Sequence, residues 1–225
     1  MSRYLDDKQH KIVSDAVAAA ELKTSGEIVT VLADRSDGYT DVVLVWAATA
    51  AFTMMSIFAL FPLPFMNVWD ALIGGWMHEW TTGELASMTI ALGLITFVAA
   101  WAVQLWEPLK FSLIPAPVRS SRVHQQAIKH FKVGAEKRTH GRTGILIYLS
   151  MREHRAEIVA DEPIAEKVSA DVWGNAMADM LVEIRKGCIA EGLAAGVRDV
   201  GEVLSEHFPR SEDNENELPD RLIEV

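Results

Sequence analysis

The sequence predicts an α/β fold in which helices flank a small sheet of three or four strands and a two-helix transmembrane hairpin is inserted. Two observations lead to this prediction. Residues 27–33 and 144–150 are short and apolar on both faces, and the first is rich in β-branched side chains, which is typical of buried strands. Between them lie two long apolar runs, residues 42–61 and 85–106, and neither contains a charged residue.

Composition excludes several classes of protein. The length of 225 residues fits one or two domains. A net charge of −10 argues against a nucleic-acid partner, because such a partner requires a basic surface. Cys188 is the single cysteine, so the chain has neither an internal disulfide framework nor a zinc site built from cysteines.

The segment before the first apolar run predicts a helix followed by a strand. Asp6 or Asp7 can cap a helix over residues 8–23, which Thr24-Ser25-Gly26 ends. The buried strand 27–33 follows, and Asp34, Ser36, Asp37 and Gly38 in the next five residues favour a turn.

The two apolar runs are predicted to cross a membrane. At 1.5 Å per residue, about 20 helical residues cover a hydrocarbon core of about 30 Å. Each run holds nine strongly inserting residues, which together favour insertion by about 3–5 kcal/mol. One central charge would cost about 3 kcal/mol, and there is none. The alternative is a soluble protein with two very apolar core helices.

Tryptophan and basic residues predict how the hairpin is oriented. Six of the seven Trp residues lie in this region, near the ends of the runs or in the connection that begins at Pro62 and Pro64, as in interfacial aromatic belts: Trp46, Trp69, Trp76, Trp80, Trp101 and Trp106. The loop 64–84 has no Lys or Arg, whereas both flanks do. The positive-inside rule therefore predicts a two-span protein of the cell (inner) membrane, with cytoplasmic termini and the loop outside.

The rest of the chain predicts further helices and strands. Pro108, Pro115 and Pro117 indicate a linker, and residues 119–133 a helix. The strand 144–150 turns into an alternating strand, 155–160. A helix then starts at Asp161-Glu162-Pro163, and two longer apolar-faced helices follow up to Pro209. Residues 211–225 are predicted to be an acidic flexible tail, in which Leu218, Leu222 and Ile223 could form a docking motif.

A lone buried strand needs a partner, and the best candidate for strand 27–33 is strand 144–150. We therefore expect residues 1–40 and 110–210 to form one discontinuous domain. Residues 41–107 would be the inserted hairpin, with spans at about 42–62 and 85–106. Such an insertion is compatible with the host fold because both ends of a two-span hairpin emerge on the same side.

Three segments together resemble the TPM domain family: Thr24-Ser25-Gly26-Glu27-Ile28-Val29, Gly144-Ile145-Leu146-Ile147-Tyr148-Leu149-Ser150 and Arg155-Ala156-Glu157-Ile158-Val159-Ala160-Asp161. The family includes thylakoid proteins linked to photosystem II repair and many uncharacterised bacterial membrane proteins. The resemblance implies an α/β sandwich with a small central sheet, and some members are described as phosphatase-like or calcium-binding. This chain departs from them in its internal hairpin and in having Arg152-Glu153-His154 in place of a Gly-rich turn.

Asp161 and Glu162 are the candidate metal ligands. They stand between a strand and a helix, and Ca²⁺ or Mg²⁺ would take their carboxylate oxygens. The resemblance places Asp161 in the region that the family associates with ion binding. The alternative role is capping of the helix. Asp34 and Asp37 are weaker candidates, because an antiparallel third strand would put Asp34 at the opposite sheet edge from Asp161.

No catalytic motif is evident, so catalytic residues stay unassigned. We expect a membrane-anchored accessory protein whose cytoplasmic TPM-like domain contacts the lipid bilayer and another membrane or membrane-associated protein, with a homo-oligomer as a further option. The alternative is a metal-dependent, phosphatase-like hydrolase, which would require at least three convergent carboxylates or a bound ion.

Overall fold

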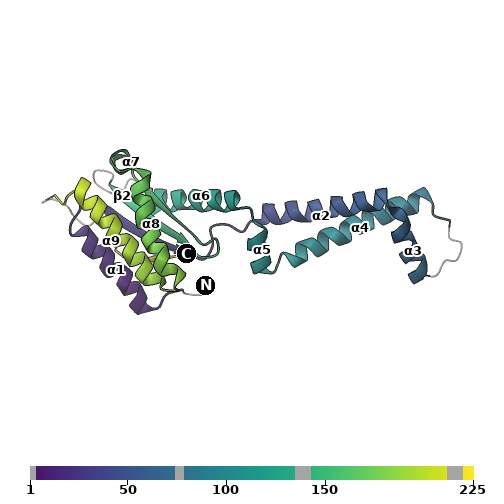
Figure 1. The fold of residues 1–225 in the computed structure, drawn as a ribbon, viewed down its shortest axis with the longest axis horizontal. Coiled ribbons are helices and arrows are strands. Elements are labelled where there is room, and N and C mark those ends of the chain that lie inside the picture. Colours follow the sequence, from purple (N-terminus) through teal and green to yellow (C-terminus); the bar gives the residue numbers. More distant parts are fainter. Residues whose placement is uncertain (1–3, 74–78, 135–142, 212–219) are drawn as a thin grey trace. The chain divides into compact units, whose positions relative to one another are not determined.

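The computed structural model describes residues 4–73, 79–134, 143–211 and 220–225. It divides into two compact units (Figure 1). The sheet unit consists of Met1–Asp37 and Ala116–Val225, and the hairpin unit is Gly38–Pro115. The sheet unit is therefore discontinuous in sequence.

A four-stranded sheet with the order β3-β2-β1-β4, in which β4 is Ile223–Glu224, lies at the centre of the sheet unit. β1 (Glu27–Ala33) pairs in parallel with β2 (Gly144–Ser150), and β3 (Arg155–Ala160) pairs with β2 in antiparallel orientation. These three strands have the predicted bounds, and the predicted pairing of β1 with β2 is confirmed. Both central strands are buried along their whole length, as their continuous apolar character requires.

Helices cover both faces of the sheet (Figure 1). On one face α1 (Asp7–Glu21), α8 (Ala170–Arg185) and α9 (Ile189–His207) form the larger core. On the other face α6 (Ala116–Gly134) packs on Val31 and Tyr148. Asp6 caps α1 by accepting a hydrogen bond from the Gln9 backbone N–H. The fold class, an α/β sheet flanked by helices, is as predicted.

The fourth strand corrects one prediction. Residues 211–225 were expected to be a flexible tail, but β4 (Ile223–Glu224) pairs in parallel with β1, and Leu222 is buried in the larger core. The Glu224 carboxylate accepts hydrogen bonds from the backbone N–H groups of Tyr4 and Leu5. A strand of two residues is too short to show a periodic pattern, so the acidic composition of residues 211–225 predicted a flexible tail instead. Leu218, the other residue of the predicted docking motif, lies outside the described residues.

The hairpin unit is built on two long helices, α2 (Thr40–Leu60) and α4 (Thr82–Val103). They pack along their length (Figure 1) through small residues such as Ala47, Ala51 and Gly93. A Cβ atom on Gly93 would lie 2.7 Å from Met55 Sδ, so glycine permits the close approach of the two helices. Both helices are long and apolar enough to cross a membrane.

Prolines start helices where a loop and a linker were predicted. Pro62 begins α3 (Pro62–Ile73), although residues 64–84 were expected to form a loop. Pro108 lies in the first turn of α5 (Glu107–Leu113), and Pro117 in that of α6. A proline ends the preceding helix but is well suited to a first helical turn, where its missing N–H has no partner to lose. The predicted linker is therefore largely helical.

Candidate functional site

Asp161 joins two strands of the sheet unit. It follows β3, and its Oδ2 accepts a hydrogen bond from the Gly144 backbone N–H at 2.9 Å, at the start of β2. Its own N–H donates to the Gly144 carbonyl, also at 2.9 Å. Asp161 occupies the N-cap position of α7 (Glu162–Lys167), but its side chain makes no capping hydrogen bond. The residue is buried, while Glu162 is exposed.

This geometry gives Asp161 a structural role. Its carboxylate accepts a hydrogen bond from a backbone N–H at the end of the β2–β3 pair that would otherwise be buried without an acceptor. The metal site predicted at Asp161 and Glu162 stays a prediction. Across residues 4–73, 79–134, 143–211 and 220–225, no three His, Cys, Asp or Glu side chains converge to hold an ion. The three carboxylates that the hydrolase hypothesis requires are thus not found in this part of the chain.

Asp34 and Asp37 lie beyond the end of β1 and contact basic side chains. Asp34 accepts hydrogen bonds from the Tyr4 hydroxyl and from Arg152 Nε, the latter at 3.1 Å. The hydrogen bond from Tyr4, followed by the effect of Arg152, holds the pKa of Asp34 below its usual value. Asp37 pairs with Arg122 Nε at 3.1 Å. Because β3 runs antiparallel to β2, Asp34 and Asp161 lie at opposite ends of the strands, as predicted.

A buried polar cluster closes the carboxyl ends of β1 and β2. Ser36 Oγ lies 3.0 Å from Ser150 Oγ and 3.1 Å from the Tyr148 hydroxyl, and Ser150 donates to Glu153 Oε2. The Ser36 backbone N–H donates to Glu153 Oε1 at 2.9 Å. Burial raises the pKa of Tyr148. Open α/β sheets place ligand sites at this end of their strands, but here the polar groups bond to one another and tie the end of β2 to the segment after β1.

Glu153 is 2% exposed, and no sequence pattern singled it out as a buried residue. It stands three residues after Ser150, in a segment that we interpreted only as a turn. The sole signal available was a serine at a strand end with a carboxylate three residues later, and that spacing is common in solvent-exposed turns.

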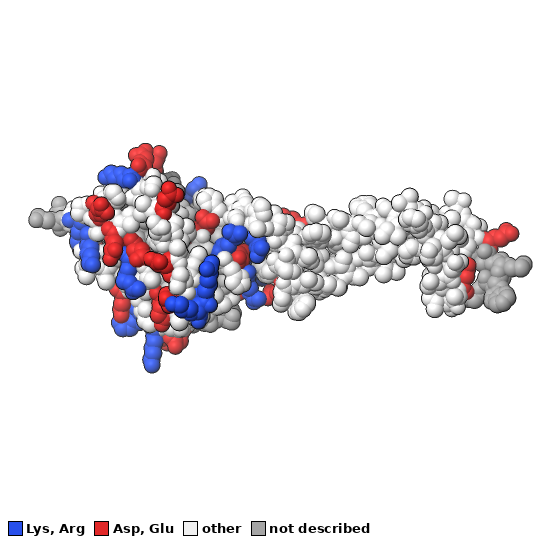
Figure 2. All heavy atoms as spheres, viewed as in Figure 1, with Lys and Arg blue, Asp and Glu red and all other residues white. Residues whose placement is uncertain are grey.

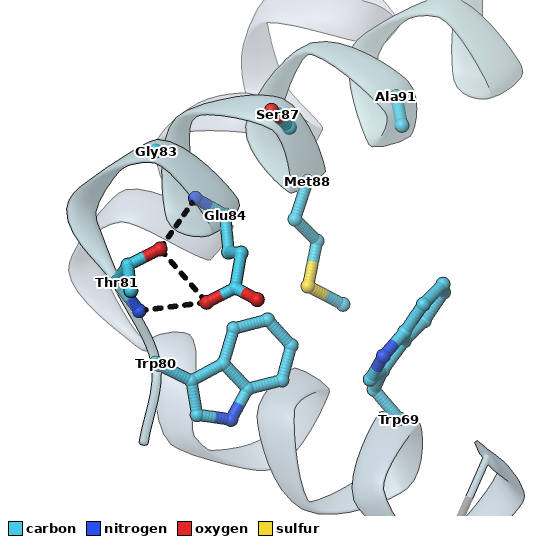
Figure 3. Close-up of a pocket in the computed structure, with 8 residues that line it drawn as sticks. All are labelled: Trp69, Trp80, Thr81, Gly83, Glu84, Ser87, Met88 and Ala91. Carbon is cyan, nitrogen blue, oxygen red and sulfur yellow. Dashed lines mark hydrogen bonds between the residues drawn. The ribbon is translucent and has the colours of Figure 1, made fainter. Parts of the chain in front are cut away.

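A pocket of about 510 Å³ opens in the hairpin unit where α3 meets the start of α4 (Figure 3). We call it the indole pocket and define it by its lining residues: Trp69, Trp80, Thr81, Gly83, Glu84, Ser87, Met88 and Ala91. Trp69 and Trp80 were predicted to lie in an interfacial belt, and Trp76 of the same belt lies outside the described residues. No sequence motif indicates that two of these indoles share a cavity.

Comparison with known proteins identifies the class of fold. The structure of the BA42 protein from the psychrophilic bacterium Bizionia argentinensis, determined by NMR, is similar, with a TM-score of 0.57. The two chains are 18% identical, and the similarity covers 100% of this chain and 98% of the other. At this identity the likeness shows the fold alone. No curated protein matches the sequence.

The sequence model of the TPM domain matches residues 118–203, which run from α6 into α9. This stretch includes β2 and β3, two of the three strands on which the resemblance was based. Residues 118–203 are therefore similar to a TPM domain, which agrees with the predicted resemblance.

Proposed function

We propose that this protein is a membrane-anchored accessory protein, in which the hairpin unit holds the TPM domain at a membrane surface where it binds another membrane protein. One observation carries the proposal: the two longest apolar helices are scarcely buried. Within the most apolar stretch of each helix, only 22% of the residues of α2 and 6% of those of α4 are buried. The core helix of a soluble protein would be mostly buried.

Many exposed side chains of α2 and α4 are large and apolar, and Figure 2 shows almost no acidic or basic side chains along these helices. They are, on α2, Leu44, Val45, Trp46, Phe52, Ile57 and Leu60, and on α4, Ile90, Leu94, Ile95, Val98, Trp101 and Val103. Surfaces of this kind are rare on soluble monomers and are matched by lipid chains. The Thr49 and Thr53 hydroxyls bond to carbonyls four residues earlier, at 2.8 and 2.7 Å, which satisfies these polar groups within the helix.

Carbonate extraction of membranes tests the anchor. Phe52→Lys combined with Ile95→Lys places one charge in each span, and each charge costs about 3 kcal/mol. The wild-type protein should remain in the pellet, and the double variant should be released or degraded. Leu22→Lys is the matched control, because Leu22 is an equally exposed apolar residue of the sheet unit. A wild-type protein that enters the carbonate supernatant would refute the anchor.

The distribution of charge supports cytoplasmic N- and C-termini, in what we propose is the inner membrane of the cell. The chain has no Lys or Arg between Asp41 and Glu107, whereas all 21 basic residues lie in the flanking segments. Reporter fusions at residue 75 and at the C-terminus test this orientation. Activity of a cytoplasmic reporter at residue 75 would overturn it.

The proposed role in binding a partner is supported by the polar cluster at the ends of β1 and β2, whose described groups hydrogen-bond to one another. Cross-linking in intact membranes, followed by purification in mild detergent, should recover a specific membrane protein. A second copy of this chain would instead indicate the homo-oligomer. Recovery of the same proteins with an unrelated two-span protein would count against a specific partner.

A further inference from the structure

The indole pocket is built by two segments of the hairpin unit. Trp69 comes from α3, while Trp80 immediately precedes the cap of α4, and Met88 lies one turn beyond Glu84 (Figure 3). Figure 3 shows the two indoles on different sides of the cavity, with the Met88 thioether directed between them. Trp80 Nε1 lies 3.4 Å from Asp70 Oδ2, a long hydrogen bond that orients this indole. The pocket thus presents aromatic surface at fixed positions.

The charge at this end of the hairpin has one sign. Between residues 42 and 106 the charged residues are Asp70, Glu79 and Glu84, and there is no Lys or Arg. Glu84 lines the pocket, and Asp70 Oδ2 lies 3.4 Å from Nε1 of the Trp80 indole. A cationic group would therefore be attracted into the pocket, and an anionic group would be repelled.

The helix terminus beside the pocket is capped by its own side chains. Thr81 caps α4, and its Oγ1 accepts a hydrogen bond from the Glu84 backbone N–H at 3.3 Å. Glu84 Oε2 accepts in return from the Thr81 backbone N–H at 2.8 Å. This capping box occupies donors that could otherwise hold an anion and places the Glu84 carboxylate at the pocket (Figure 3).

We propose that the indole pocket binds an organic ammonium group that carries a hydrocarbon chain. The cation lies against the electron-rich faces of Trp69 and Trp80, with the Glu84 carboxylate as its counter-charge. The hydrocarbon chain of the ligand lies along the apolar lining at Met88 and Ala91. The shared chemistry is that of alkylammonium compounds, and a lipid with a choline or ethanolamine headgroup is one source. The proposal is independent of the accessory role and of the partner proposed above.

The test uses the full-length protein in a maltoside detergent and dodecyltrimethylammonium as the probe, with binding measured by isothermal titration calorimetry. Glu84→Gln removes the charge but retains a side chain able to complete the capping box, so α4 keeps its start. We expect about tenfold weaker binding of the probe. Glu107→Gln, which changes a hairpin carboxylate at the start of α5, is the matched control and should bind as the wild type does.

A second pair of variants tests the aromatic wall. Trp80→Leu should also weaken binding about tenfold, whereas Trp106→Leu, which removes an exposed indole outside the pocket, should have no effect. Far-UV circular dichroism establishes that each variant retains its helices. Probe binding that is unchanged in both Glu84→Gln and Trp80→Leu overturns the proposal.

Further ligands distinguish the contribution of the hydrocarbon chain to binding from that of the ammonium group. Dodecanol should bind weakly and without dependence on Glu84, and choline should bind more weakly than the probe but with that dependence. Equal affinity for dodecanol and the probe would mean that the pocket recognises hydrocarbon alone, which contradicts the proposal. Native mass spectrometry after reconstitution with phosphatidylethanolamine or phosphatidylcholine tests whether the ligand is a lipid. If the wild-type protein retains the lipid and the Glu84→Gln variant does not, the ligand is a lipid. If choline compounds bind but no lipid is retained, the site binds free alkylammonium compounds.

Discussion

Glu21 should make the stability of the sheet unit depend on pH. Its carboxyl group is buried at the end of α1, where Oε1 accepts a hydrogen bond from the Ile28 backbone N–H at 2.8 Å. Oε2 is buried and receives no hydrogen bond from the described residues. Burial, and then the carboxylates of Glu27 and Asp220, raise the pKa of Glu21 from 4.5 to about 8. The Arg210 guanidinium nearby bonds to the backbone carbonyl of Glu21, at 3.3 Å.

The sign and size of the effect follow from proton linkage. Between pH 4.5 and about 8 the folded chain keeps a proton on Glu21 that the unfolded chain has released. The free energy of unfolding therefore falls as pH rises, by about 1.4 kcal/mol per pH unit. The contribution of Glu21 to the free energy of unfolding is fully present below pH 4.5 and is lost by about pH 8. The total change is roughly 3–5 kcal/mol.

Glu21→Gln removes this dependence, because the amide has nearly the same shape, accepts from Ile28 and cannot ionise. The free energy of unfolding at each pH is measured by urea unfolding in mild detergent, monitored by far-UV circular dichroism. At pH 5 the variant and the wild type should agree within about 1 kcal/mol, and at pH 9 the variant should be more stable by roughly 3–5 kcal/mol. Glu206→Gln, which changes an exposed carboxylate of α9, should follow the wild type. Equal pH slopes for Glu21→Gln and the wild type would falsify the reasoning.

Three further predictions concern packing and hydrogen bonding in the sheet unit. Asp161→Ala should lower the free energy of unfolding by about 1–3 kcal/mol, since it leaves the Gly144 N–H buried without an acceptor, while Asp161→Asn should cost less; equal losses would contradict the hydrogen-bonding role. Leu222→Ala should lower the free energy of unfolding by about 2–4 kcal/mol in urea, because Leu222 is 4% exposed. Leu22→Ala, at a residue that is 68% exposed, should lower it little. A small loss for Leu222→Ala would mean that β4 is not held in solution. Gly192→Ala should cost about 1–3 kcal/mol, because the new Cβ would lie 2.8 Å from a backbone carbonyl of α8, and an unchanged melting temperature would contradict this close packing.

Much of the sheet could be predicted because its strands carry strong local signals. β2 is a continuous apolar run between a glycine and a turn, and β3 alternates, so their bounds follow from the sequence. The pairing of β1 with β2 followed from the need of a buried strand for a neighbour. β4 could not be predicted, since two residues have no period and its stability comes from Leu222 and Glu224 meeting residues far away in the chain.

The candidate sites were harder to predict than the fold. Asp161 was correctly placed between a strand and a helix, yet its hydrogen-bonding partner, Gly144, lies 17 residues away along the chain. Glu153 and Ser36 meet only because β1 and β2 end side by side. The indole pocket likewise depends on how α3 folds back toward α4.

The sequence by itself determined the α/β class, the order of the main strands and the two long uncharged apolar runs, because periodicity, turn residues and the absence of charge act over short stretches of chain. Only the tertiary structure decided what each polar group meets. It buried Glu21 and Glu153, directed Asp161 to a backbone N–H and brought Trp69 and Trp80 to one cavity. The physical reason is that the burial and hydrogen bonding of a side chain depend on neighbours that are distant in sequence, which no local pattern records.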